Sequence, residues 1–300
     1  MSSTLLNRQS VKAEALRLGF SACGLAPAEP VQEPYASRFR QWIQKGCQAN
    51  MNYMENHVEM RLDPRLLVSG VKTIISVALN YFPSRQASGL SMYAQGQDYH
   101  NVVRERLQQL LQVLKADGRC FVDTAPVLER YWAWRAGLGW MGRNTLLILP
   151  HHGSTYFLGE LFVMDEADSY DTPLDFSCGQ CRRCIDACPM GAINETGIDA
   201  RRCLSYLTIE NRGPLPKDTL LQDCFYGCDR CQQACPHLQH ATPTSEEAFL
   251  PSEELLNVSP QEWKNLTQEQ YQHLFKGSAV KRAKYEGLKR NIDACKFHSE

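Results

Sequence analysis

The sequence predicts an α/β (α+β) fold with a mixed sheet, followed by a cysteine-rich module and a short helical segment at the C-terminus. Helical and extended patterns alternate over residues 1–168, which is typical of a domain that packs helices on a sheet. Nine of the 13 cysteines then lie between Cys178 and Cys235. A basic helical pattern ends the chain. We therefore expect three parts, which span residues 1–168, 169–240 and 241–300.

One long helix and four strands are expected in the first part. The stretch YHNVVRERLQQLLQVLKADG, residues 99–118, places apolar side chains at helical spacing and ends at a glycine. Runs of β-branched and aromatic residues predict the strands. They are VKTIISVAL (71–79), CFVDT (120–124), NTLLILP (144–150) and TYFLGELFVMD (155–165). A turn at Gly153 is expected to join the last two as a hairpin, which argues against a purely parallel sheet.

The composition is ordinary for a globular protein, with 43% hydrophobic and 22% charged residues. No apolar run approaches the ~20 residues that a membrane helix needs, and the N-terminal stretch lacks the apolar core of an export signal. We therefore expect a cytoplasmic protein without membrane contact, with reduced thiols and a monomeric state. No glycine-rich dinucleotide loop or Walker loop occurs, so no nucleotide site is predicted.

Charge is unevenly distributed along the chain. The net charge is −1, yet the stretch from Lys276 to Arg290 holds six basic residues and one acidic residue. A basic face on an acidic body is suited to contact with phosphates. The alternative is a solvated helix face, which charge alone slightly favours.

The cysteine run CGQCRRCIDACPMGAI, residues 178–193, has spacings of 2, 2 and 3 and a proline after the fourth cysteine. Bacterial two-cluster ferredoxins use this run: three thiolates bind one 4Fe–4S cluster, and the fourth binds the other cluster. Zinc sites usually pair two Cys-x2-Cys knuckles without the Cys-Pro step. The sequence therefore predicts a bacterial-ferredoxin-like module with two 4Fe–4S clusters, in preference to zinc or redox thiols.

Crossed ligation distributes the cysteines between the two clusters. The first cluster takes Cys178, Cys181, Cys184 and Cys235. The second takes Cys188, Cys228 and Cys231, which leaves one ligand open. Cys203 and Cys224 compete for that place on spacing alone. Since clusters carry single electrons, the first part of the chain is expected to hold the acceptor chemistry.

An acidic residue follows a predicted strand in FVDTAPVLERYWAWRAGLGWMGRN, residues 121–144. Asp123 would lie at the C-terminal edge of that strand, where α/β proteins tend to place chemistry. Alternatively, Asp123 or Thr124 caps a helix that begins at Pro126. The residues alone leave both interpretations open.

Six segments together resemble the epoxyqueuosine reductase family in order and spacing, over nearly the whole chain. They are VDTAPVLER, AGLGWMGRN, FLGEL, the cysteine module, CLSYLTIENRG and FKGSAVKRAKYEGLKRN. The resemblance implies a cobalamin-dependent iron–sulfur enzyme related to reductive dehalogenases. It would reduce epoxyqueuosine to queuosine at wobble position 34 of tRNAs with GUN anticodons (Asp, Asn, His and Tyr acceptors), the last step of queuosine biosynthesis. An electron donor such as a flavodoxin or ferredoxin would be a second partner.

The resemblance also assigns roles to individual side chains. Asp123 matches the family's proton donor and Cys203 the missing cluster ligand, whereas Cys224 matches no cysteine of the family. Five side chains lie in stretches that resemble the cobalamin-contacting stretches of the family and are expected to contact cobalamin. They are Arg61, Tyr93, Asp123, Asn144 and Ser154. The resemblance further implies that three basic side chains hold the anticodon stem through its phosphates: Lys281, Arg282 and Arg290.

Some positions depart from the family pattern. Ala125 stands where glycine is usual and Arg143 where lysine is usual, and these two cations are not interchangeable. In DYHNVV, Val103 replaces the glycine of the cobalt-ligating D-x-H-x-x-G class. His100 is therefore interpreted as structural.

Two other functions fit parts of the sequence. One is a cobalamin- or flavin-linked reductase of a small molecule such as an organohalide, which the basic tail disfavours. The other is a plain iron–sulfur electron-transfer protein, in which the first part is only a docking platform. Extraction of the purified protein for cobalamin would separate this second alternative from the enzyme.

Overall fold

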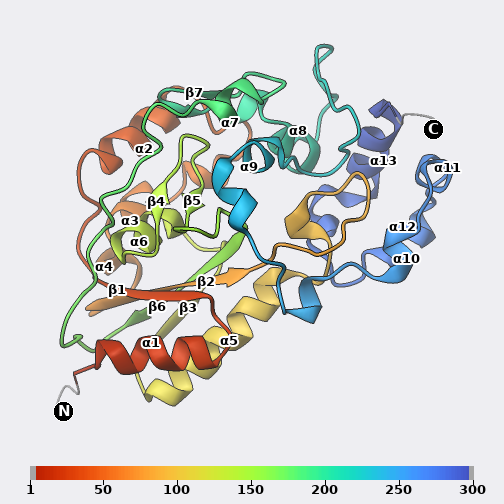
Figure 1. The fold of residues 1–300 in the computed structure, drawn as a ribbon. Coiled ribbons are helices and arrows are strands. Elements are labelled where there is room, and N and C mark those ends of the chain that lie inside the picture. The colour runs from red at the N-terminus through yellow and green to blue at the C-terminus, as the bar shows by residue number, and fades with distance from the viewer. Residues whose placement is uncertain (1–4, 297–300) are drawn as a thin grey trace.

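A computed structural model describes residues 5–296 of the chain (Figure 1). Its centre is a four-stranded sheet in the order β1-β2-β6-β3. The strands are β1 (Ala22–Pro27), β2 (Thr73–Asn80), β3 (Gly118–Phe121) and β6 (Tyr156–Val163). Every pairing in this sheet is antiparallel. The predicted combination of helices and sheet is confirmed, but the expected mixed sheet is wrong.

The position of β6 explains this difference. The chain passes from β2 through helix α5 (Tyr99–Leu114) to β3, and these two strands run in the same direction. A direct pairing of β2 with β3 would be parallel, as in a βαβ unit. β6 instead lies between them and pairs antiparallel with both.

Helices cover both faces of the sheet. In Figure 1, α1 (Arg8–Arg17) and α5 lie together below it, whereas α6 (Glu129–Arg135) lies above. Val103 and Leu107 of α5 belong to a buried cluster on the first face, and Trp132 of α6 to a cluster on the second. Because both faces are covered, β2 is buried from Thr73 to Leu79 and appears in the sequence as a continuous apolar run.

The expected hairpin forms only in part. Leu149 and Gly153 exchange backbone hydrogen bonds, and Gly153 has a positive φ of 81°, so the predicted turn is present. However, β5 (Leu147–Ile148) pairs with β4 (Trp140–Met141) and not with β6. The hairpin prediction is therefore wrong in its strand pairing, since β2 and β3 occupy both edges of β6.

Shorter elements complete the described chain. Between β1 and β2 lie α2 (Tyr35–Gln44), α3 (Val58–Leu62) and α4 (Pro64–Leu67). The cysteine module contains α7 (Arg183–Asp186), β7 (Ile193–Asn194), β8 (Gly197–Ile198), α8 (Leu204–Ile209) and α9 (Arg230–Gln233). The C-terminal segment contains α10 (Glu253–Leu256), α11 (Pro260–Lys264), α12 (Gln268–Leu274) and α13 (Lys284–Ala294).

The module and the C-terminal segment share one hydrophobic core. Leu207 of the module packs in the same buried cluster as Trp263 and Leu288, and Leu90 of the first part joins them. The proposed part boundaries therefore lie within a continuously packed molecule. Among residues 5–296, none of the helices combines the length and apolar character that a membrane crossing requires.

Candidate active site and cluster module

The eight predicted cluster cysteines lie in two neighbouring groups. Burial, followed by the adjacent thiolates of Cys178 and Cys235, raises the pKa of Cys184. Burial also raises the pKa of Cys235, and the thiolates of Cys178 and Cys181 add to this effect. These four cysteines are the set that the sequence assigns to the first cluster.

The second group contains Cys188, Cys203, Cys228 and Cys231. Burial raises the pKa of Cys228 to about 11, with a contribution from Cys203. Cys203 in turn lies within electrostatic reach of Cys188. Burial raises the pKa of Cys231, and Cys228, Cys203 and, from the first group, Cys184 raise it further. The two groups therefore lie next to each other.

Cys224 differs from Cys203 in how its sulfur is used. The Cys224 thiol donates hydrogen bonds to the carbonyl oxygens of Gly227, at 3.2 Å, and Tyr226, at 3.7 Å. A thiolate that binds iron has no proton to donate. The sulfur of Cys203 instead faces the backbone N–H groups of Ser205 and Tyr206, which favour its charged form. This difference favours Cys203 over Cys224 as the fourth ligand.

No group of three or more His, Cys, Asp or Glu side chains within residues 5–296 is arranged to hold a single metal ion. In a cubane cluster each thiolate binds a different iron, so the thiolates stand farther apart than the ligands of one ion.

Direct hydrogen bonds connect the module to the sheet domain. The Asp229 carboxylate accepts from the Met92 backbone N–H at 2.7 Å. Gln232 of α9 donates to the Tyr81 hydroxyl at 3.0 Å and to the Ser154 carbonyl at 3.1 Å. Tyr93 and Tyr226 are joined through their hydroxyls. Two residues in the stretches that resemble cobalamin contacts, Tyr93 and Ser154, therefore lie at this junction.

Two further residues of that set are also buried. Asn144 is 3% exposed, and its Nδ2 donor has no hydrogen-bond partner in the described chain. A buried donor of this kind calls for a ligand or water. Arg61 is 8% exposed and donates to the carbonyl oxygen of Tyr53 at 2.8 Å. Its guanidinium therefore supports a loop.

Asp123 lies in the loop between β3 and α6 with a left-handed φ of 54°. Its carboxylate accepts a hydrogen bond from the Tyr99 hydroxyl at 2.5 Å and lies 3.4 Å from His100 Nε2. The capping alternative is wrong, because α6 begins at Glu129 and has no side-chain cap. The Asp123 carboxylate instead contacts the first turn of α5.

The Asp123 side chain is 58% exposed. Protein nevertheless surrounds it closely enough that burial is the largest single influence on its pKa. Such a combination is typical of a side chain that lines a recess. Burial raises the pKa of Asp123, but hydrogen bonds from His100 and Tyr99 outweigh it and lower the pKa. Asp123 is therefore ionised at neutral pH.

His100 carries the proton in this group. Its Nδ1 lies 2.6 Å from the Asp98 carboxylate and its Nε2 faces Asp123. Burial lowers the pKa of His100, but the two carboxylates outweigh that effect and raise it to about 9. The sequence interpretation of His100 as purely structural missed this contact, as it missed Tyr99. The signal was present in DYH, residues 98–100, where the long helix begins.

The basic tail has a mixed role. Arg282 forms two 2.8 Å hydrogen bonds with Glu210. Arg290 donates to the carbonyl oxygens of Leu207 and Asn211, each at 2.9 Å. Both guanidiniums are thus used within the protein, unlike Lys281.

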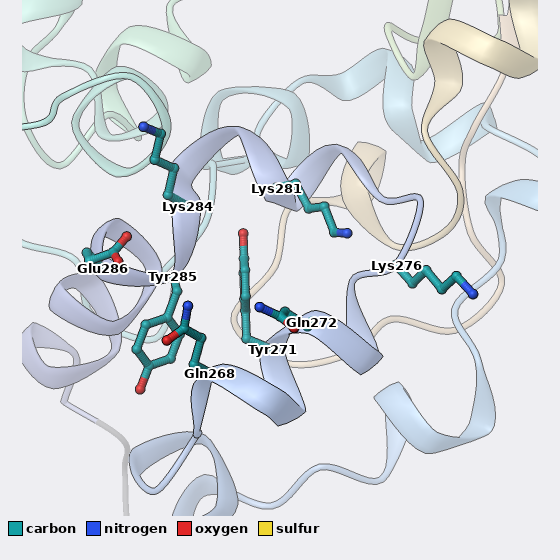
Figure 2. A pocket seen from close by; sticks show the side chains of 8 residues that line it. All are labelled: Gln268, Tyr271, Gln272, Lys276, Lys281, Lys284, Tyr285 and Glu286. Atoms are coloured by element: carbon teal, nitrogen blue, oxygen red, sulfur yellow. The ribbon is translucent and has the colours of Figure 1, made fainter.

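Lys281 lines an open groove of about 540 Å³ together with Lys276, Lys284 and Tyr285 (Figure 2). Figure 2 shows the amines of Lys276 and Lys281 on one side, whereas that of Lys284 points the other way. None of these lysines has an ion-pair partner among residues 5–296. Since Glu286 is the one acidic residue that lines the groove with these three lysines, the groove carries an excess of positive charge.

Two cysteine groups in a module that is joined to a sheet domain with a proton-bearing carboxylate–imidazole site define the chain as an iron–sulfur oxidoreductase. The family model "Epoxyqueuosine reductase QueG, DUF1730" matches residues 61–124, and "4Fe-4S double cluster binding domain" matches residues 177–237. The epoxyqueuosine reductase of Cellulophaga algicola is 44% identical over 298 residues, or 95% of this chain and 97% of the relative. That of Escherichia coli is 37% identical over 95% of this chain and 79% of the relative. The chain belongs to the epoxyqueuosine reductase family.

Solved structures agree with this assignment. An epoxyqueuosine reductase crystallised with an epoxyqueuosine-modified tRNA-Tyr stem loop superposes with a TM-score of 0.87 at 27% identity, over 95% of this chain and 79% of that one. A Bacillus subtilis enzyme superposes with a TM-score of 0.85 at 28% identity, over the same shares. In that structure the catalytic aspartate loop is swung out of the active site.

Proposed function

We propose that this protein reduces epoxyqueuosine to queuosine at the wobble position of tRNAs with GUN anticodons. The observation that carries the proposal is the Asp123 carboxylate, held against a protonated His100 in the loop that follows the edge strand β3. Removal of the epoxide oxygen as water takes two electrons and two protons. The Asp123–His100 site can supply protons, and the two cysteine groups with their clusters can supply electrons, so together they meet this requirement.

The residues in the stretches that resemble cobalamin contacts fit a corrinoid. Its periphery carries amide side chains, which can pair with the buried Ser154 hydroxyl and with the Asn144 Nδ2 donor, which has no partner among residues 5–296. Tyr93 would pack beside these two, and Arg61 would support the neighbouring loop. When bound, cobalamin would supply the electron-rich cobalt that opens an epoxide.

The two cysteine groups would pass single electrons toward the recess from a donor such as a flavodoxin or ferredoxin. In this proposal Cys178, Cys181, Cys184 and Cys235 hold one cluster, and Cys188, Cys203, Cys228 and Cys231 hold the other. The protein would act as a cytoplasmic monomer.

Asp123 would deliver the proton to the leaving epoxide oxygen. Because Asp123 is ionised at rest and His100 is protonated, Asp123 would receive its proton from His100. Asp123→Asn should retain the fold and the iron content but slow a single turnover by ~10²–10⁴-fold, the usual effect of losing a positioned acid. The assay is nucleoside mass spectrometry after reaction of chemically reduced enzyme with epoxyqueuosine-tRNA. Wild-type rates would remove Asp123 from the mechanism.

The lysine groove would hold phosphates of the anticodon stem. Lys281→Glu with Lys284→Glu should weaken tRNA binding, and the salt dependence should fall by about 0.9 units of log–log slope per lost contact. Lys217→Glu, at an exposed lysine that does not line the groove, gives the same charge change per site and serves as control. An equal effect per substituted lysine in the two variants would show that only net charge matters. Turnover at saturating tRNA should remain unchanged in the groove variant.

A further inference from the structure

Two carboxyl side chains lie behind the Asp123 loop and take no part in the proposed reaction. Glu160 is on β6, opposite Ser76 of β2 and Phe121 of β3 in the sheet register. It is 0% exposed. Glu160 shares a face of the sheet with Phe162, which packs in the cluster that α6 covers. Glu129 is the first residue of α6.

Glu160 is unusual because neither carboxyl oxygen has a hydrogen-bond partner of ordinary geometry in the described chain. Within residues 5–296, the Ser76 hydroxyl opposite it also has no partner of ordinary geometry. A buried carboxylate in this position would be costly, since the Ser76 hydroxyl offsets its charge by less than burial opposes it. Burial raises the pKa of Glu160 well above its usual range, and the nearby Glu129 and Asp123 carboxyls raise it further. Glu160 is therefore a neutral acid.

Glu129 connects this acid to the Asp123 loop. Its Oε1 accepts a hydrogen bond from the backbone N–H of Asp123. Burial, followed by the charge of Asp123, raises the pKa of Glu129 to about 8. The hydrogen bond from the Asp123 N–H and the positive charges of Arg130 and His100 lower this pKa, but by less than burial and Asp123 raise it. Glu129 is mostly protonated at neutral pH.

The Asp123 backbone needs such support. A φ of 54° is unfavourable for a residue with a β-carbon. Tyr99 and His100 contact only its side chain, whereas Glu129 contacts its backbone. Within the loop, the Thr124 N–H donates to the Val122 carbonyl oxygen at 2.6 Å across Asp123. Loss of the Glu129 acceptor would leave the loop held by this turn and by the side-chain contacts, without its link to α6.

We propose that Glu129 is a positioning residue that holds the Asp123 loop in its reactive conformation. This inference rests on the proposed function, in which Asp123 delivers the proton. A pH dependence follows. Ionisation of Glu129 would place its negative charge beside Asp123 and Glu160, and would drive the Asp123 carboxylate away. Turnover should then decline as the pH rises through about 8.

The first experiment follows the loop directly in the full-length protein. Hydrogen exchange of residues 120–128 is measured by mass spectrometry in wild type, Glu129→Gln and Glu129→Leu. The Leu variant lacks the acceptor, so exchange should accelerate by about tenfold, the effect of one lost hydrogen bond. The Gln variant retains an acceptor oxygen and should exchange like wild type. This readout needs no epoxyqueuosine, so it tests the positioning role even if the proposed function fails.

The second experiment measures single-turnover rates at saturating tRNA. Glu129→Leu should react about tenfold more slowly with unchanged tRNA affinity, and Glu129→Gln should retain most of the rate near pH 7. The Gln variant should also lose the decline near pH 8 and keep activity until His100 deprotonates near 9. If Leu fails to fold, this shift in the Gln profile decides the question. An unchanged alkaline decline in Gln, or wild-type exchange in a folded Leu variant, would overturn the proposal.

Discussion

Replacement of His100 by glutamine tests the charge arrangement around Asp123 without any cofactor. In the protein, the His100 side chain is 23% exposed and lies between the carboxylates of Asp98 and Asp123. Glutamine is neutral at every pH but can still donate a hydrogen bond. The variant therefore removes the titrating charge while it retains much of the packing.

The size of the effect follows from the pKa of His100. Its folded pKa is about 9 against an ordinary 6.5, and each unit corresponds to ~1.4 kcal/mol. The upper limit is therefore ~3 kcal/mol. Because Asp123 is 58% exposed, solvent screening reduces the expected contribution to ~1–2 kcal/mol. Since the folded pKa is the higher one, this stabilisation is complete below pH 6.5 and disappears as the pH rises through about 9.

The measurement is the free energy of unfolding in urea, for wild type and His100→Gln, at about pH 6 and about pH 9.5. Wild type should lose ~1–2 kcal/mol more than the variant over this interval. An NMR titration of the imidazole, assigned by comparison with the variant, should give a midpoint near 9. Parallel unfolding curves at both pH values, or a midpoint near 6.5, would refute the charge arrangement described for Asp123.

Two other changes have clear expected outcomes. Cys203→Ala should lower the iron content of the reconstituted protein from about eight to about four per chain, whereas Cys224→Ala should retain about eight; the reverse result would exchange their roles. Asn291→Leu should cost ~2 kcal/mol or more in thermal unfolding, because the Asn291 amide donates to the buried carbonyls of Thr208 at 2.8 Å and Phe225 at 2.9 Å. A stability within ~0.5 kcal/mol of wild type would show that these carbonyls find other donors.

Local patterns in the sequence were sufficient for elements whose cause is local. The helical spacing in residues 99–118 predicted α5. The expected stop at Gly118 is wrong, because the helix ends at Leu114, where Lys115 adopts a left-handed conformation, and Gly118 begins β3. The apolar run 71–79 predicted β2 to within two residues. The cysteine spacing likewise separated two thiol groups that the structure brings together.

Features decided by distant residues could not be predicted in this way. D-T-A-P is a good capping sequence, and it was the contact with Tyr99, 24 residues upstream, that turned Asp123 toward α5. Charge patterning indicated that the tail is basic but could not show which cations are free. Arg282 is paired with Glu210, 72 residues away, and Arg290 binds carbonyl groups, whereas Lys281 has no ion-pair partner in the part of the chain that the structure describes.

The junction between the module and the sheet domain has a consequence for electron delivery. Transfer between redox centres requires a fixed separation, and a flexible linker would vary it. Here Gln232 of α9 is 6% exposed and binds both Tyr81 and Ser154, while Asp229 binds the Met92 backbone. Both residues directly neighbour cluster cysteines in the sequence. Loss of the second cluster should therefore loosen the Ser154 loop as well as interrupt the electron path, because the same short helix serves both.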